Sequence, residues 1–164
     1  MPSMHTFTIQ PIRELVYKYC PDGKGWIDPF SGENSPAEIT NDLNPAKSAK
    51  FHLHAFDFIT QLEGQYNGCL FDPPYSLRQV KECYKEIGIP DLTQHETNYF
   101  PGYIKDAIAP KIKTGGIVIC FGWDSTGFGK NRGFEFLEIL LVCHGGHHAD
   151  TIITVERKFK YEMF

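Results

Sequence analysis

The chain of 164 residues lacks the features that mark a secreted, membrane or fibrous protein. It contains no apolar run near the roughly 20 residues of a membrane-spanning helix, and no stretch that resembles a signal peptide. Its five cysteines are odd in number and scattered, which argues against a disulfide framework and favours reduced thiols. Repeats and low-complexity linkers are also missing. We therefore expect one cytoplasmic domain over residues 1–164, with no membrane partner.

Positive charge is scarce as well. Sixteen Lys and Arg residues stand against twenty Asp and Glu residues, which gives a formal net charge of −4. This balance argues against binding nucleic acid by electrostatic attraction alone, although a local basic patch on an acidic body stays possible.

The periodicity of apolar residues predicts an α/β fold. Strand patterns occupy residues 26–28, 37–42, 51–55, 67–71, 115–122, 135–146 and 149–159. Helix patterns occupy residues 11–20, 56–64, 77–88 and 99–112, with Ser76 as the N-cap of the third. Helices separate the early strands, and the last two strands are adjacent. This order predicts a mostly parallel sheet with an antiparallel strand at one edge.

Acidic residues follow three of the predicted strands. They are Asp28, Asp42 and Asp72. Ligands of such sheets bind at the carboxyl ends of the strands, so three successive acids there predict a site. Asp42 has two readings that the sequence leaves open: it accepts hydrogen bonds from a ribose, or it closes an Asx turn in "NDLNP". Gly32, four residues after Asp28, permits close approach of the backbone to a ligand.

The segment "LFDPPY", residues 70–75, combines an acid, two rigid residues and an aromatic ring at a strand end. The amines of nucleobases are poor nucleophiles because their lone pair is delocalised into the ring. Two fixed acceptors, the Asp72 carboxylate and the Pro73 carbonyl, can orient such an amine toward an electrophile, and the prolines hold both acceptors rigid. Tyr75 supplies a face for stacking an extruded base. The alternative is a rigid surface turn.

These segments resemble the S-adenosylmethionine-dependent amino-methyltransferases. "DPPY" resembles their motif IV, in the form typical of the DNA adenine-N6 branch, and "DPFSG" resembles their motif I. "FDPPYSLRQVKECY" and "HGGHHADTIITVERK" look like small phage- or prophage-encoded members. The resemblance, over about residues 6 to 158, implies a Rossmann-like class I methyltransferase fold and a site-specific adenine DNA-methyltransferase. The expected cofactor is S-adenosylmethionine.

The resemblance also implies roles for individual residues. The catalytic residues would be Asp72, Pro73, Pro74 and Tyr75. The residues lining the cofactor would be Thr8, Asp28, Pro29, Phe30, Gly32, Asp42, His54 and Ala55. The spacing from Asp28 to Asp42 is too short for the family's full helix after the first strand. His54 and Ala55 stand where relatives often have an acid, with Asp57 as a nearby alternative.

The chain lacks room for a target-recognition domain, so we expect the contacts with DNA to come from inserts or from a partner subunit. The inserts are residues 88–100 and the loop "GWDSTGFGKNRGFE". The predicted nucleic-acid contacts are Arg78, Lys130, Asn131 and Arg132, the last three as a backbone clamp near the substrate. A solvated helix face and a mobile hairpin tip are the alternatives. No metal site is expected at Cys143, His144, His147 and His148, because no second pair lies at a matching distance.

Three rival readings stay open at this stage. The same chemistry on RNA or on cytosine N4 keeps the enzyme class and changes the substrate. A non-catalytic binding subunit with the same fold is the third, and the missing recognition domain favours it.

Overall fold

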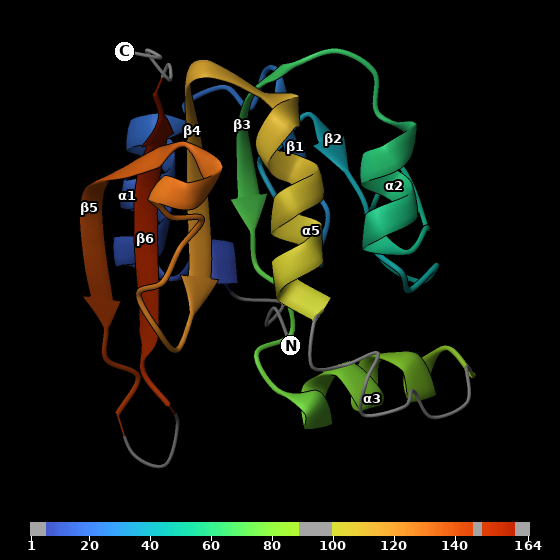
Figure 1. Cartoon of the computed structure of the whole chain (residues 1–164). Coiled ribbons are helices and arrows are strands. Elements are labelled where there is room, and N and C mark those ends of the chain that lie inside the picture. Colours follow the sequence, from blue (N-terminus) through green and yellow to red (C-terminus); the bar gives the residue numbers. More distant parts are fainter. Residues whose placement is uncertain (1–5, 89–99, 146–148, 160–164) are drawn as a thin grey trace.

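The computed structural model describes residues 6–88, 100–145 and 149–159. A six-stranded sheet in the order β2-β1-β3-β4-β6-β5 forms its centre (Figure 1). Its strands are β1 (Trp26–Asp28), β2 (Ile39–Thr40), β3 (Tyr66–Phe71), β4 (Ile112–Gly122), β5 (Phe134–Val142) and β6 (Thr151–Lys158). The first four are parallel, and β6 is antiparallel to β4 and β5. The predicted fold class is confirmed, with β6 one place in from the edge rather than at it.

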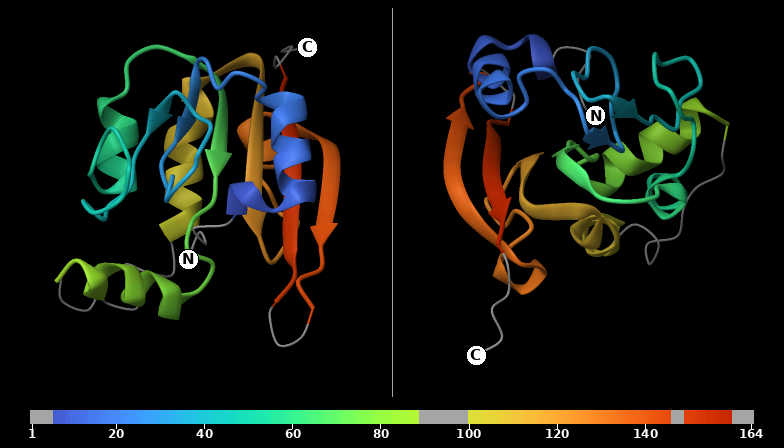
Figure 2. Two further views of the ribbon diagram at one scale, coloured as in Figure 1. Left: turned by 180° about the vertical axis from the view of Figure 1, so that it is seen from behind. Right: turned by 90° about the horizontal axis from the view of Figure 1, so that it is seen from above.

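Helices cover both faces of the sheet (Figure 2). α1 (Gln10–Tyr19) lies on one face, and α2 (Ala55–Gln61) and α5 (Phe100–Ile108) lie on the other. Side chains alternate between the two layers because successive residues of a strand point to opposite faces. Leu70 thus packs in the α1 layer with Ile12, while Phe71 packs in the other layer with Ile104.

Local sequence accounts for the helix boundaries. Pro11 lies in the first turn of α1, where its missing N–H is not needed. The Ser76 side chain accepts a hydrogen bond from the Gln79 N–H at 3.2 Å and caps α3 (Leu77–Glu86), as predicted. The α-helical run of α5 ends before Pro110, which lies in the short 3₁₀ helix η2 (Ala109–Lys111). Two further 3₁₀ helices are η1 (Thr6–Thr8) and η3 (Lys130–Arg132).

The strand predicted at residues 51–55 is wrong. A single parallel bridge joins Asn41 to Phe51, and no ladder follows. The buried Asn41 side chain instead bonds both backbone groups of Leu53, receiving its N–H at 2.9 Å and donating to its carbonyl at 3.0 Å. These side-chain bonds occupy the groups that a neighbouring strand would use.

The connection between β1 and β2 contains no helix, as its length predicted. The first predicted insert largely lies outside the described residues, since residues 89–99 are not among them. Within the described part of the chain, no helix combines the length and the apolar character needed to cross a membrane.

Candidate active site

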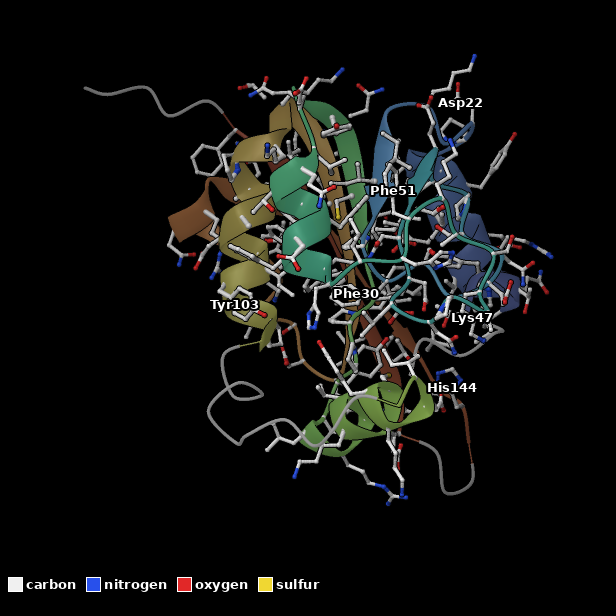
Figure 3. The ribbon with its side chains drawn as sticks, turned by 90° about the vertical axis from the view of Figure 1, so that its right-hand side faces the viewer. Asp22, Phe30, Lys47, Phe51, Tyr103 and His144 are labelled. Carbon is white, nitrogen blue, oxygen red and sulfur yellow. The ribbon has the colours of Figure 1, made fainter. Side chains whose placement is uncertain are left out.

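The order of the strands reverses between β1 and β3. From β1 the chain moves outward to β2, then returns to place β3 on the other side of β1. In open α/β sheets, ligands bind outside the carboxyl ends of the strands at such a reversal. Phe30, just after β1, contacts the ring of Phe71 at the end of β3, with ring centroids 5.5 Å apart. Phe30 lies between the strands and α3, at the level where these strands end (Figure 3).

Asp28 organises the loop that follows β1. Its carboxylate is buried and accepts hydrogen bonds from the Phe30 N–H at 2.9 Å and from the Ser35 hydroxyl at 2.6 Å. Burial raises the pKa of Asp28 to about 7, and these two bonds oppose the rise. The carboxylates of Asp72 and Asp42 raise this pKa further. Because β1, β2 and β3 are parallel, the three acids lie at the same edge of the sheet, as the sequence predicted.

The Asx-turn reading of Asp42 is confirmed, and its contact with a ribose stays a prediction. One carboxylate oxygen closes an Asx turn by accepting from the Asn44 N–H at 2.8 Å. The other accepts from the Gly32 N–H at 3.0 Å, which ties the end of β2 to the loop after β1. Asn41 donates to the Pro29 carbonyl at 3.1 Å and strengthens the same link. Gly32 has a φ of 53°, a left-handed conformation that glycine adopts readily.

Asp72 lies fully buried at the end of β3. The Tyr75 hydroxyl donates to its Oδ1 atom, and Oδ2 has no hydrogen-bond partner among the described residues. Burial raises the pKa of Asp72 to about 6, while the Tyr75 hydroxyl and the nearby Thr6 hydroxyl lower it. A buried acceptor atom without a donor is costly in a folded protein, so Oδ2 is an atom that can accept a hydrogen bond from a ligand.

A cavity of about 190 Å³ opens at the carboxyl ends of β3 and β4, and the two chain neighbours of Asp72, Phe71 and Pro73, line it. Its walls include Pro73, Pro74 and Tyr75 on one side and Trp123, from the end of β4, on another. The rings of Tyr75 and Trp123 meet edge to face, with centroids 5.5 Å apart. The cavity is smaller than the roughly 300–1,000 Å³ of drug-sized ligand sites, so it suits one planar ring system rather than a whole nucleotide.

The remaining predicted cofactor residues lie around the same edge. Thr8 is exposed in η1, and the adjacent Phe7 contacts Phe121 near the end of β4, with centroids 5.7 Å apart. His54 precedes α2, and its ring lies 5.1 Å from that of Tyr84 and within hydrogen-bond distance of its hydroxyl. Ala55 is buried at the start of α2. Contact of these residues with a cofactor stays a prediction.

None of the predicted clamp residues, Lys130, Asn131 and Arg132, is among the residues that line the cavity. These residues form η3, directly before β5, whose first residue Phe134 pairs with Lys158. The carboxyl end of β4 pairs with Ile152, six residues away along β6, or about 20 Å. The loop after β4 runs back along the sheet and carries η3 toward the amino ends of the parallel strands.

The contacts of Arg132 indicate a structural role. Its guanidinium pairs with Asp106 of α5 at 2.6 Å and donates to the Phe128 carbonyl at 3.0 Å. Arg78 is exposed on α3 and pairs with Glu82 at 2.8 Å, one helical turn away. A role of these residues in binding nucleic acid stays a prediction.

The Cys143 and His144 pair lies in the connection between β5 and β6. The His144 ring is 2.8 Å from the Thr151 hydroxyl. His147 and His148 lie outside the described residues.

Sequence reasoning missed several residues of this site. Trp123 follows the fourth parallel strand, so the rule that located the three acids would also have found it. Lys105 enters the cavity from α5, and no periodicity distinguishes it from a surface lysine. Glu156 is fully buried on β6 and accepts from the Phe128 and Gly129 N–H groups at 2.5 and 2.8 Å. It holds the loop that forms one wall of the cavity.

No family model matches the chain, and no curated protein matches it in sequence. Solved structures, however, match nearly all of it. TrmN from Thermus thermophilus has a TM-score of 0.55 at 13% identity, covering 90% of this chain and 48% of its own. The 1,6-didemethyltoxoflavin-N1-methyltransferase of Burkholderia thailandensis has a TM-score of 0.60 at 11% identity, covering 92% and 78%. The N-methyltransferase NodS from Bradyrhizobium japonicum has a TM-score of 0.52 at 8% identity, covering 94% of this chain and 97% of its own.

The chain has the Rossmann-like fold of methyltransferases. It spans about half the length of TrmN and most of the other two proteins. At these identities the likeness establishes the fold, and the chemistry has to be argued from the site.

Proposed function

We propose that this protein transfers the methyl group of S-adenosylmethionine to the N6 amine of adenine in DNA. The observation that carries the proposal is the arrangement around Asp72: a buried carboxylate oxygen without a donor among the described residues, whose chain neighbours Phe71 and Pro73 line a cavity about the size of one base. Pro73 and Pro74 make the backbone there rigid, and Tyr75 and Trp123 supply aromatic walls.

The residues between β1 and β2 fit the cofactor. The Ser31 hydroxyl is buried without a hydrogen-bond partner among the described residues, and Gly32 lets the backbone approach a ligand closely. Asp42 would hold the ribose hydroxyls, and Phe30 would border the methionine part. The bound cofactor supplies an electrophilic methyl group on a sulfonium. A similarly folded protein, the Burkholderia methyltransferase, has 1,6-didemethyltoxoflavin and S-adenosylhomocysteine bound.

Asp72 and the Pro73 carbonyl would orient the amine by accepting its two N–H groups. The lone pair of the amine would then attack the methyl carbon and form the new N–C bond, while the electron pair of the broken S–C bond would stay on sulfur. The amine would pass one proton to the Asp72 carboxylate. Asp72 therefore has to be ionised before transfer, which its pKa of about 6 permits at neutral pH.

The substrate would be a base extruded from the DNA, because the cavity has room for one ring system only. Sequence reading would come from a partner subunit, since the described residues include no separate recognition domain.

The test incubates the purified protein with labelled S-adenosylmethionine and either unmethylated genomic DNA or total RNA, then identifies the labelled nucleoside by mass spectrometry. N6-methyladenine in DNA is the expected product. A label in RNA or on cytosine N4 would contradict the proposed substrate while keeping the chemistry. The absence of both transfer and cofactor binding would point to a non-catalytic subunit.

The variant Asp72→Ala should lower transfer at least 100-fold and leave cofactor affinity, measured by calorimetry, within a few-fold of wild type. Asp22→Ala is the matched control, because Asp22 is exposed and lies at the opposite end of the molecule from α3 (Figure 3). Full activity of Asp72→Ala would exclude this mechanism.

A further inference from the structure

Strand β5 carries a row of large apolar side chains that are exposed. Phe136, Ile139 and Leu141 are 48%, 54% and 57% exposed. They share one face of the sheet, because they pair with the residues of β6 that alternate with Ile153 and Val155, and those two pack in the α1 layer. The register of β5 shifts once after Phe136, which lets residues three apart lie on the same face.

No α-helix of the described residues covers this row. Figure 1 shows α5 and α2 over the other half of the sheet, and α1 lies on the opposite face. β5 also stands at the end of the strand order, so no strand in the described part of the chain pairs with its outer edge. An apolar surface along an exposed edge strand is a typical site for association with another strand.

The charges on β5 protect only its first half. Glu135 and Glu138 are both among its first five residues, whereas four apolar residues follow in succession over positions 139–142. Proteins usually block an exposed sheet edge with charged residues or prolines, and this stretch contains neither. Leu140 packs against the α1 layer. The neighbouring Ile139 and Leu141 are therefore the apolar side chains that the unprotected half of the strand exposes.

We propose that the chain forms a two-fold symmetric dimer in which β5 pairs antiparallel with β5 of a second copy. This inference goes beyond the proposed function and does not depend on it. The partner strand has to bring a free edge without charges, and β5 of a second copy has one. The strand at the other end of the sheet, β2, is only two residues long. Antiparallel pairing of a strand with its own copy also satisfies a two-fold axis, which joins the same surface of both copies.

The side chains of β5 favour one register for this pair. A two-fold axis at Leu140 places Ile139 of each copy opposite Leu141 of the other, so the most exposed apolar side chains of the strand cover one another. The same register places Glu138 opposite Val142 and keeps the glutamates of the two copies apart. An axis at Glu138 would place two like charges directly opposite each other, which destabilises a strand pair.

The first experiment measures the mass of the purified full chain in solution by sedimentation velocity at several micromolar concentrations. It compares wild type with Ile139→Lys and with the matched control Tyr17→Lys, because Tyr17 is 68% exposed on α1, on the other face of the sheet. We expect wild type and Tyr17→Lys to be dimers. Ile139→Lys should be a monomer with an unchanged circular dichroism spectrum, since its side chain is exposed within one copy. A monomeric wild type would leave this face to a partner of another kind and overturn the proposal, as would a dimeric Ile139→Lys.

The second experiment tests the register by cross-linking and does not need a monomeric variant. The exposed Cys143 is first changed to Ser, and Ile139→Cys and Leu141→Cys are then introduced singly and together. The double variant should form disulfide-linked dimers under mild oxidation, because directly opposite residues lie within disulfide distance. Each single variant should stay unlinked, because its two cysteines lie diagonally, about 7–8 Å apart. An unlinked double variant, or single variants that link equally well, would overturn the proposed pairing.

Discussion

Asp72 and Tyr75 act on each other directly. The tyrosine hydroxyl donates to the carboxylate, which lowers the pKa of Asp72 against the effect of burial. In return, the negative charge of Asp72 and the burial of the ring raise the pKa of Tyr75, so the phenol stays protonated and remains a donor. The acid thus keeps the tyrosine ring in place at the cavity wall.

This coupling predicts the pH dependence of transfer. Because the amine needs an ionised acceptor, kcat/KM should rise with pH through an apparent pKa near 6 and then level off. Tyr75→Phe removes a hydrogen bond that favours the ionised form, so its rising limb should move to higher pH, with a several-fold lower rate at pH 7. A rate profile of Tyr75→Phe that overlays the wild-type profile would contradict the coupling.

The loop from Trp123 to Gly129 depends on a single strand residue, Glu156. Two backbone N–H groups of the loop point at its carboxylate, and a side chain at Gly127 would lie 2.2 Å from Glu156 Oε2. The close approach explains why glycine, which also has a φ of 53° here, occupies position 127.

Glu156→Gln should therefore destabilise the protein. An amide offers one acceptor oxygen, so one buried N–H group would face another donor, at a cost of about 1–3 kcal/mol. The free energy of unfolding from urea titration measures the effect, with Glu135→Gln on the exposed side of β5 as the control. Equal stability of the two variants would show that Glu156 does not hold this loop.

The sequence patterns predicted the helices and strands more accurately than the contacts between residues far apart in the chain. Local rules predict the helix caps and the lengths of the strands before Asp28 and Asp72. They also predict that three acids lie at the same edge of the sheet. The strand expected at residues 51–55 had suitable alternation, but the Asn41 side chain satisfies Leu53 instead. The path of the loop after β4 depends on buried Glu156, which resembles any strand glutamate in the sequence. That is why the sequence could not show where Lys130, Asn131 and Arg132 lie along the sheet.

At the scale of the whole molecule, the parallel strands gather negative charge at one end of the sheet. Burial raises the pKa of Asp28 to about 7 and of Asp72 to about 6, well above that of aspartate in an unfolded chain. Between pH 4 and pH 7 the folded state thus binds more protons than the unfolded state. This end of the sheet is maintained at a cost in stability that grows as the acids ionise.

The free energy of unfolding should consequently fall as pH rises from about 4 to about 7 and then become flat. Asp28→Asn removes one of the two titrating groups and should reduce this slope by the contribution of about one proton. The loop should stay intact, because the amide can still accept from the Phe30 N–H and can donate to the Ser35 hydroxyl oxygen. Urea titrations at several pH values test this expectation. A stability that rises across the interval would mean that the two acids ionise normally in the folded protein.

The absence of a helix between β1 and β2 has a consequence for evolution of the site. The short connection is held by the hydrogen bonds of four side chains instead of by helix packing. Each of them bonds to the backbone or to another of the four, which are Asp28, Ser35, Asn41 and Asp42. This loop should tolerate few substitutions, since each of its polar groups is satisfied in one geometry only. An apolar interface can accept side chains of other shapes by repacking, whereas the directional hydrogen bonds of this loop need these particular side chains.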